Sequence, residues 1–168
     1  MLDGTRWMAV VSSLGLTFML GIGATASALD LHQFWDKRCH DCHGHAGEFA
    51  RRHLKVENGK LTGRHHTDNL KQFMGRHEMG PEHVERIYGM LLAQAATKPV
   101  YQQKCAGCHG TAAELVRASI SRQDGVLVAL PSKRPLSELL KKHGKLSAEE
   151  MPIVLESLAR VLGEVAPN

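Results

Sequence analysis

The chain has 168 residues, of which 43% are hydrophobic and 23% are charged, and Lys and Arg together exceed Asp and Glu by four. This length suits one ordinary domain or two very small ones, because domains usually contain about 100 to 150 residues. The composition is that of a globular protein, and the small excess of positive charge gives no reason to expect nucleic acid as a partner.

The first 28 residues have the pattern of a secretory signal peptide. Arg6 precedes an apolar run that extends to about Gly23, and an A-x-A sequence ends at Ala28. We therefore expect residues 1–28 to be removed, the mature chain to begin near Leu29, and the protein to reside in the periplasm. The alternative is an uncleaved inner-membrane anchor that faces the periplasm, because the apolar stretch is about long enough to cross a bilayer. Membrane contact is expected only in that case.

The remaining chain is an internal repeat. Cys105 follows Cys39 by 66 positions (105 − 39 = 66), and the same shift aligns much of the two halves without a gap. This predicts two small domains, at residues 29–97 and 98–168. Among the aligned pairs are Trp35 with Tyr101, Gly59 with Gly125, Leu70 with Leu136, Phe73 with Leu139 and Met74 with Leu140.

In chain order, each unit predicts a short helix before its cysteines, an irregular middle, a short helix that ends in a shared histidine, and a longer final helix. The final helix of the first unit is expected to start at Gly80-Pro81 and to run to about Ala96, because proline is favourable at the first helical position. Ser147 and Glu150 form a capping-box pattern at the start of the last helix. We find no convincing strand, and the expected fold class is therefore all-α.

Both cysteine pairs are followed directly by histidine. They are Cys39, Cys42 and His43 in the first unit, and Cys105, Cys108 and His109 in the second. In C-x-x-C-H, the two thiols add to the two vinyl groups of one haem and the histidine ligates its iron. A single C-x-x-C could also be a redox dithiol, part of a zinc site or a disulfide. Two copies, each followed by His and Gly, favour two covalently bound haem c groups.

An aromatic residue stands four positions before the first cysteine of each motif, Trp35 in one unit and Tyr101 in the other. With the C-x-x-C-H motifs, this resembles the class I-like cytochrome c domain over most of each unit, in a layout similar to that of small periplasmic dihaem cytochromes. The resemblance implies two tandem helical domains, each wrapped round one covalent haem. It also implies that the first and last helices of each domain pack together near the cysteines.

The second axial ligand of each iron is open between methionine and histidine. Class I-like domains usually supply a methionine, but no methionine of one unit is aligned with a methionine of the other. Of the eleven histidines, the shift pairs only His43 with His109 and His77 with His143. His77 and His143 each follow an apolar stretch at helical spacing, which should face the haem. We therefore expect bis-His ligation, with Met79 or Met90 as the alternative in the first unit and Met151 in the second.

Two six-coordinate haems would leave no iron position open to a substrate. The expected function is electron transfer, without an enzymatic reaction of its own, either as a carrier or as a subunit of an oxidoreductase. Redox proteins are the expected partners, among them a membrane-bound oxidoreductase. The alternatives are a dihaem redox enzyme, peroxidase-like or acting on sulfur compounds, and a gas or redox sensor with a labile distal ligand. The charged middle segment that includes Arg51 and Arg52 receives no site role.

Overall fold

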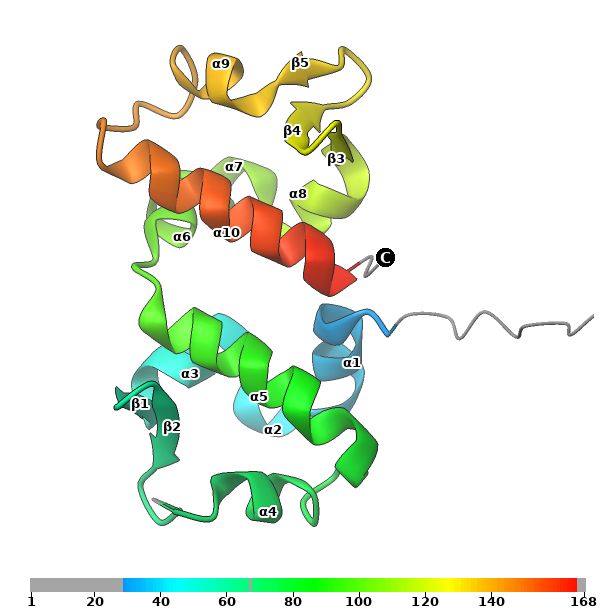
Figure 1. The fold of residues 1–168 in the computed structure, drawn as a ribbon, viewed down its shortest axis with the longest axis vertical. Helices are drawn as coiled ribbons and strands as arrows, with labels where there is room; N and C mark the ends of the chain where they lie inside the picture. The colour runs from blue at the N-terminus through cyan, green and yellow to red at the C-terminus, as the bar shows by residue number, and fades with distance from the viewer. Residues whose placement is uncertain (1–28, 67, 166–168) are drawn as a thin grey trace, which may run out of the picture.

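The structure is a computed structural model that describes residues 29–66 and 68–165. Figure 1 shows two units along the long axis of the molecule, with the N-terminal unit below the C-terminal one. No helix within the described ranges is long and apolar enough to span a membrane. The expected signal peptide, residues 1–28, lies outside the described residues.

The two units contain matching elements in the same order. The first contains α1 (Leu31–Arg38), α2 (His40–His43), α3 (Ala46–His53), β1 (Leu54–Glu57), β2 (Lys60–Gly63), α4 (Leu70–Met74) and α5 (Pro81–Ala96). The second contains α6 (Val100–Lys104), α7 (Ala106–His109), α8 (Ala112–Ser119), β3 (Ile120–Gln123), β4 (Val126–Ala129), β5 (Arg134–Pro135), α9 (Leu136–Leu140) and α10 (Glu150–Val165).

The two long final helices begin as the sequence predicts. Helix α5 has Gly80 as its N-cap and Pro81 in its first turn, and it ends at Ala96. Before α10, the Ser147 N–H donates to Glu150 Oε2 at 2.9 Å and the Glu150 N–H donates to Ser147 Oγ at 3.2 Å. This is the reciprocal bonding of a capping box. Both predicted helix starts are therefore confirmed.

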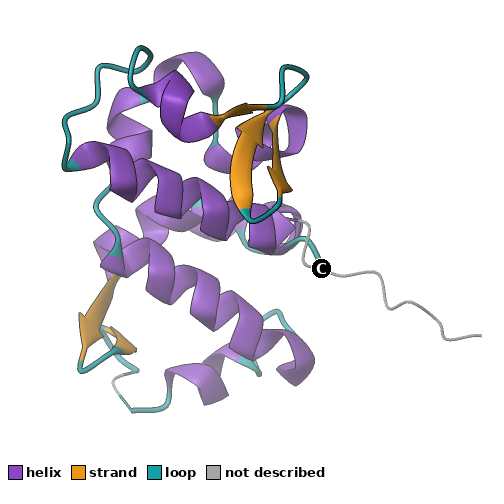
Figure 2. Ribbon diagram, turned by 45° about the horizontal axis from the view of Figure 1, so that its top comes forward, coloured by secondary structure: helices purple, strands orange, loops and turns teal. Residues whose placement is uncertain are grey.

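The all-α prediction is wrong. The structure is mixed, with 58% of residues in helices and 14% in strands. The strands form one two-stranded and one three-stranded antiparallel sheet, in the middle segments that the sequence analysis took as irregular (Figure 2). Leu54 pairs with Gly63 in the first sheet and Ile120 with Ala129 in the second, so the 66-residue repeat preserves the strand register.

Two short turns explain these hairpins. Asn58 and Gly59 have φ values of 50° and 74°, and Asp124 and Gly125 have values of 48° and 80°. Positive φ at both central positions defines the type I′ turn, whose twist matches that of the flanking strands and which favours Asn-Gly and Asp-Gly. These dipeptides were the signal in the sequence from which the strands could have been predicted.

The turn in the second hairpin offers a direct test. Replacing Gly125 with alanine should lower the free energy of unfolding by about 1 kcal/mol, because a side chain is strained at its φ of 80°. The matched control is Gly163→Ala in α10, where a new Cβ would meet no atom within 4 Å. That change should stabilise the protein by about 0.5 kcal/mol or more, because alanine favours a helix interior. Chemical denaturation of both variants checks this, and equal effects would contradict the assigned turn.

The buried side chains form two separate clusters. In the first, Ile87 and Met90 of α5 are almost completely buried. In the second, Val154 and Leu158 of α10 pack with Val116 of α8. The first cluster is built from residues up to Leu91 and the second from Val100 onward, with further apolar side chains packed against each. Each unit thus encloses its own core, and the final helix contributes to it in both.

The junction between the units is polar as well as packed. Helix α1 contacts α10, and there His32 Nε2 lies 2.8 Å from Glu164 Oε2. Both side chains are about nine-tenths buried. Nearer the surface, the guanidinium of Arg117 in α8 makes two hydrogen bonds to Asp30, the N-cap residue of α1, at 2.9 and 3.0 Å. The two units are therefore joined by specific side-chain pairs.

Candidate haem sites

The C-x-x-C-H segments form one short helix in each unit. Cys39 precedes α2 and Cys105 precedes α7, and the histidine of each motif is the last residue of its helix. The next residue has a φ of 65° at Gly44 and 68° at Gly110, a left-handed conformation that favours glycine. The glycine after each motif therefore turns the chain directly after the histidine.

The buried aromatic residue four positions before each motif donates a hydrogen bond to this turn. The Trp35 Nε1–H donates to the carbonyl of Gly44 at 2.8 Å. In the second unit, the Tyr101 hydroxyl donates to the carbonyl of Gly110 at 3.3 Å. Burial raises the pKa of Tyr101 to about 12, so its hydroxyl keeps the proton that this bond needs at neutral pH. Different aromatic side chains thus provide the same contact in the two units.

The second histidine of each unit lies beyond the end of a short helix, which differs from the sequence expectation. Helix α4 ends at Met74 and α9 ends at Leu140, three residues before His77 and His143. The residues after these histidines, Glu78 and Gly144, have φ values of 54° and 85°, in the left-handed region. Because each of these helices has only five residues, it ends before the histidine, and the histidine therefore lies in the segment that follows the helix.

In the second unit the two predicted ligands face each other. Nε2 of His109 lies 3.4 Å from Nε2 of His143. Imidazole nitrogen binds metal ions at about 2 Å, so a metal between two such nitrogens needs a separation of about 4 Å. The observed separation is therefore about 0.6 Å short of that arrangement.

A large cavity surrounds this histidine pair. Its volume is about 570 Å³, within the range of roughly 300 to 1,000 Å³ that is common for cofactor pockets. It is lined by His109 and His143, by the apolar side chains Leu136, Leu139, Leu140, Val154 and Leu158, and by both cysteines of the motif, Cys105 and Cys108. The attachment residues and the paired imidazoles therefore border one apolar space, as a covalent haem would require.

In the first unit the corresponding histidines are also neighbours. The ring centroids of His43 and His77 are 5.9 Å apart, against 5.7 Å for His109 and His143. Burial lowers the pKa of His43, and the charges of His77 and His53 lower it further. Because iron binds the neutral imidazole, this shift favours the ligating form. The repeat thus places two imidazoles together in both units.

The side chains around the two pairs differ in kind. In the first unit, Phe49 makes an edge contact with His43 at 4.6 Å between centroids, and Phe73 stacks on His77 at 4.9 Å. The second unit has Leu115 and Leu139 at the aligned positions, and both line its cavity. Phe49 was not among the predicted site residues. The available signal was that an apolar residue stands six positions after the histidine of each C-x-x-C-H motif, Phe49 in one unit and Leu115 in the other.

The four cysteines are free thiols in this structure, with Cys39 buried, Cys105 partly buried, and Cys42 and Cys108 exposed. Burial raises the pKa of both Cys39 and Cys105. The raised pKa is unfavourable for a reactive redox dithiol, which depends on a thiolate stabilised near neutral pH. Within the described ranges no group of three or more His, Cys, Asp or Glu side chains comes together around a metal-sized space.

The alternative methionine ligands lie in or against the two cores. Met90 is 1% exposed within the first core, and Met79 packs against that core. Met151 packs against the second core and is not among the residues that line the cavity around His109 and His143. His66 stacks on Phe73 with centroids 3.9 Å apart, so it lies at the margin of the first site.

Comparison of the chain with protein-family models, curated proteins and solved structures finds no match.

Proposed function

We propose that this protein is an exported dihaem cytochrome c that transfers electrons, with two histidine ligands on each iron. The observation that carries the proposal is the facing pair His109 and His143, 3.4 Å apart between their Nε2 atoms, beside two free cysteines at the wall of a cavity of about 570 Å³. The aligned pair His43 and His77 in the first unit supports the same role there.

Each residue has a distinct task in this proposal. Cys39 and Cys42 would bind one haem through thioether bonds, and Cys105 and Cys108 would bind the other. His43 and His109 would be the proximal ligands, with His77 and His143 opposite them. Haem bound in this way supplies a reversible one-electron couple, and two imidazole ligands lower its potential relative to a Met-ligated one.

The protein environment favours electron transfer over substrate chemistry. With both axial positions taken by side chains from the same unit, no substrate would reach the metal directly. The apolar wall formed by Leu136, Leu140 and Val154 would exclude water from one side of the second site. Redox proteins are then the natural partners, including a membrane-bound oxidoreductase, and the periplasm is the proposed location, based on the signal-peptide pattern of residues 1–28.

Absorption spectroscopy of the purified protein tests the proposal. We expect a haemochrome assay to give two haems per chain. The ferric spectrum should lack a methionine-to-iron charge-transfer band, and the reduced spectrum should not respond to carbon monoxide. Absence of covalent haem would refute the proposal. Rapid binding of carbon monoxide by the wild-type protein would instead favour the alternative of a haem enzyme or a sensor with a labile ligand.

A further inference from the structure

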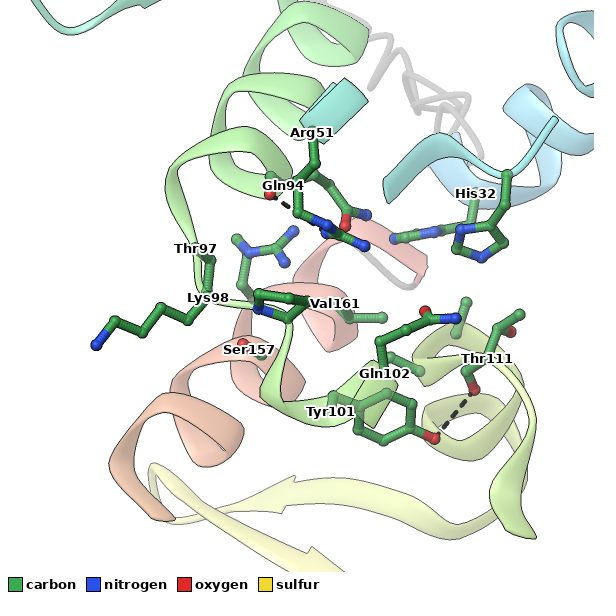
Figure 3. A pocket seen from close by; sticks show the side chains of 15 residues that line it. His32, Arg51, Gln94, Thr97, Lys98, Tyr101, Gln102, Thr111, Ser157 and Val161 are labelled. Carbon is green, nitrogen blue, oxygen red and sulfur yellow. Dashed lines mark hydrogen bonds between the residues drawn. The ribbon is translucent and has the colours of Figure 1, made fainter. Parts of the chain in front are cut away.

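A second cavity lies between the two units, and none of the four paired histidines lines it (Figure 3). Its volume is about 60 Å³, and it shares only Tyr101 with the residues that line the cavity around His109 and His143. The linker residues Thr97 and Lys98 form one wall, and the Lys98 side chain extends outward at the rim. The cavity is thus a feature of the junction and belongs to neither haem site.

Positive charge is concentrated in its lining. The first unit contributes the guanidinium of Arg51, and the second unit contributes that of Arg160. Among the described residues that line the cavity, none is acidic. The nearby carboxylate of Glu164 is bonded to both His32 and Arg160, the latter at 2.6 Å. This buried carboxylate therefore binds one imidazole and one guanidinium, that of Arg160, and makes no bond to Arg51 within the described part of the chain.

Of the two arginines, Arg51 has the weaker bonds to neighbouring acceptors. Its Nη1 donates a long hydrogen bond of 3.5 Å to the carbonyl of Gln94, and within the described ranges it forms no ion pair closer than 4.0 Å. Burial lowers the pKa of Arg51, while the charge of Glu48 opposes this shift. The guanidinium has five N–H donors, so most of them are available to a ligand.

The fold makes room for this guanidinium. A Cβ added at Gly47 would lie 2.7 Å from Gln94 Oε1 and 3.2 Å from Arg51 Nη1. The aligned residue in the second unit is Ala113, so only the first unit lacks a methyl group at this position. His45 adds a further donor, because its Nδ1 accepts a hydrogen bond from the Gly47 N–H at 3.3 Å, which leaves the proton of the neutral ring on Nε2.

We propose that this cavity binds a small tetrahedral oxoanion, phosphate or sulfate, between Arg51 of the first unit and Arg160 of the second. Guanidinium groups bind such oxygens through paired, charge-assisted hydrogen bonds. A volume of about 60 Å³ corresponds to a few water positions at roughly 10 to 15 Å³ each, which suits an ion of five heavy atoms and excludes a nucleotide. Because the two arginines come from different units, a bound anion stabilises the junction.

Calorimetric titration of the full purified chain, as isolated, tests the site with phosphate and with sulfate, separately and at constant ionic strength in chloride. We expect saturable binding of one anion per chain. Arg51→Gln should weaken it about tenfold or more, because a charge-assisted bond is lost. The matched control is Arg52→Gln, since Arg52 is its exposed neighbour and pairs with Glu48, and it should change the affinity less than twofold.

Gly47→Ala is the second test and keeps every charge. The added methyl group would displace the Gln94 amide and the Arg51 guanidinium, so binding should weaken while the unfolding temperature in chloride changes by only a few degrees. Failure of both anions to bind the wild-type protein would overturn the proposal. Equal losses in Arg51→Gln and Arg52→Gln would also overturn it, because they would indicate general surface charge.

Discussion

The His143→Ala variant should bind carbon monoxide after reduction, whereas the wild-type protein should not. In the structure Nε2 of His143 lies 3.4 Å from Nε2 of His109. Its removal leaves the position opposite His109 without a protein ligand, and the surrounding wall is apolar, with Leu139 and Leu140 adjacent. We expect about half of the haem in the sample to respond, because the first unit keeps its own pair, His43 and His77.

The control for this experiment is His83→Ala. His83 belongs to the first unit and contacts Phe34, with ring centroids 4.8 Å apart, and it belongs to neither facing pair. This variant should leave the spectrum unchanged with carbon monoxide. If His143→Ala also remained unresponsive while still holding two haems, another side chain would be the ligand, and the assignment of His143 would be wrong. Met151→Ala would then be the next variant to examine.

The Glu164→Ala variant should lower the free energy of unfolding by about 2 to 4 kcal/mol. Glu164 is 8% exposed and bonds His32 of the first unit and Arg160 of its own helix. Truncation leaves the buried His32 and the partly buried Arg160 without their acceptor, and breaking a buried pair from one side is more costly than replacing both partners. The variant should also loosen the junction, because His32 and Glu164 belong to different units.

Thermal unfolding followed by circular dichroism measures this effect. A loss of about 3 kcal/mol corresponds to a decrease of roughly 6 to 12 °C in the unfolding temperature for a chain of this size. Glu156→Ala is the matched control, since Glu156 is exposed on the same helix, and it should shift the temperature by about 2 °C or less. A Glu164→Ala variant as stable as this control would contradict the role assigned to the buried pair.

The two proposed haem sites should differ in their properties, although the two units repeat one pattern. Aromatic rings contact both histidines of the first pair, through Phe49 and Phe73, while leucines stand at the aligned positions of the second. Since the polarity and packing around a haem influence its reduction potential, the two irons are expected to be inequivalent.

The sequence by itself determined the parts that depend on local spacing. Residue positions alone give the 66-residue repeat, the two C-x-x-C-H motifs and the alignment of His77 in one unit with His143 in the other. The start of α5 at Pro81 and the capping box before α10 were also predictable, because helix capping involves residues within one turn. The hairpin signals were present as Asn-Gly and Asp-Gly but were not recognised.

Tertiary structure decided what depends on contacts between distant segments. Periodicity cannot show that α4 and α9 end three residues before their histidines, since tertiary packing sets where such short helices stop. Nor does it show that His32 meets Glu164, 132 positions away, or that Arg51 and Arg160 border one cavity. These contacts arise from how two similar units pack on each other, and the 66-residue repeat carries no information about that packing because it describes each unit alone.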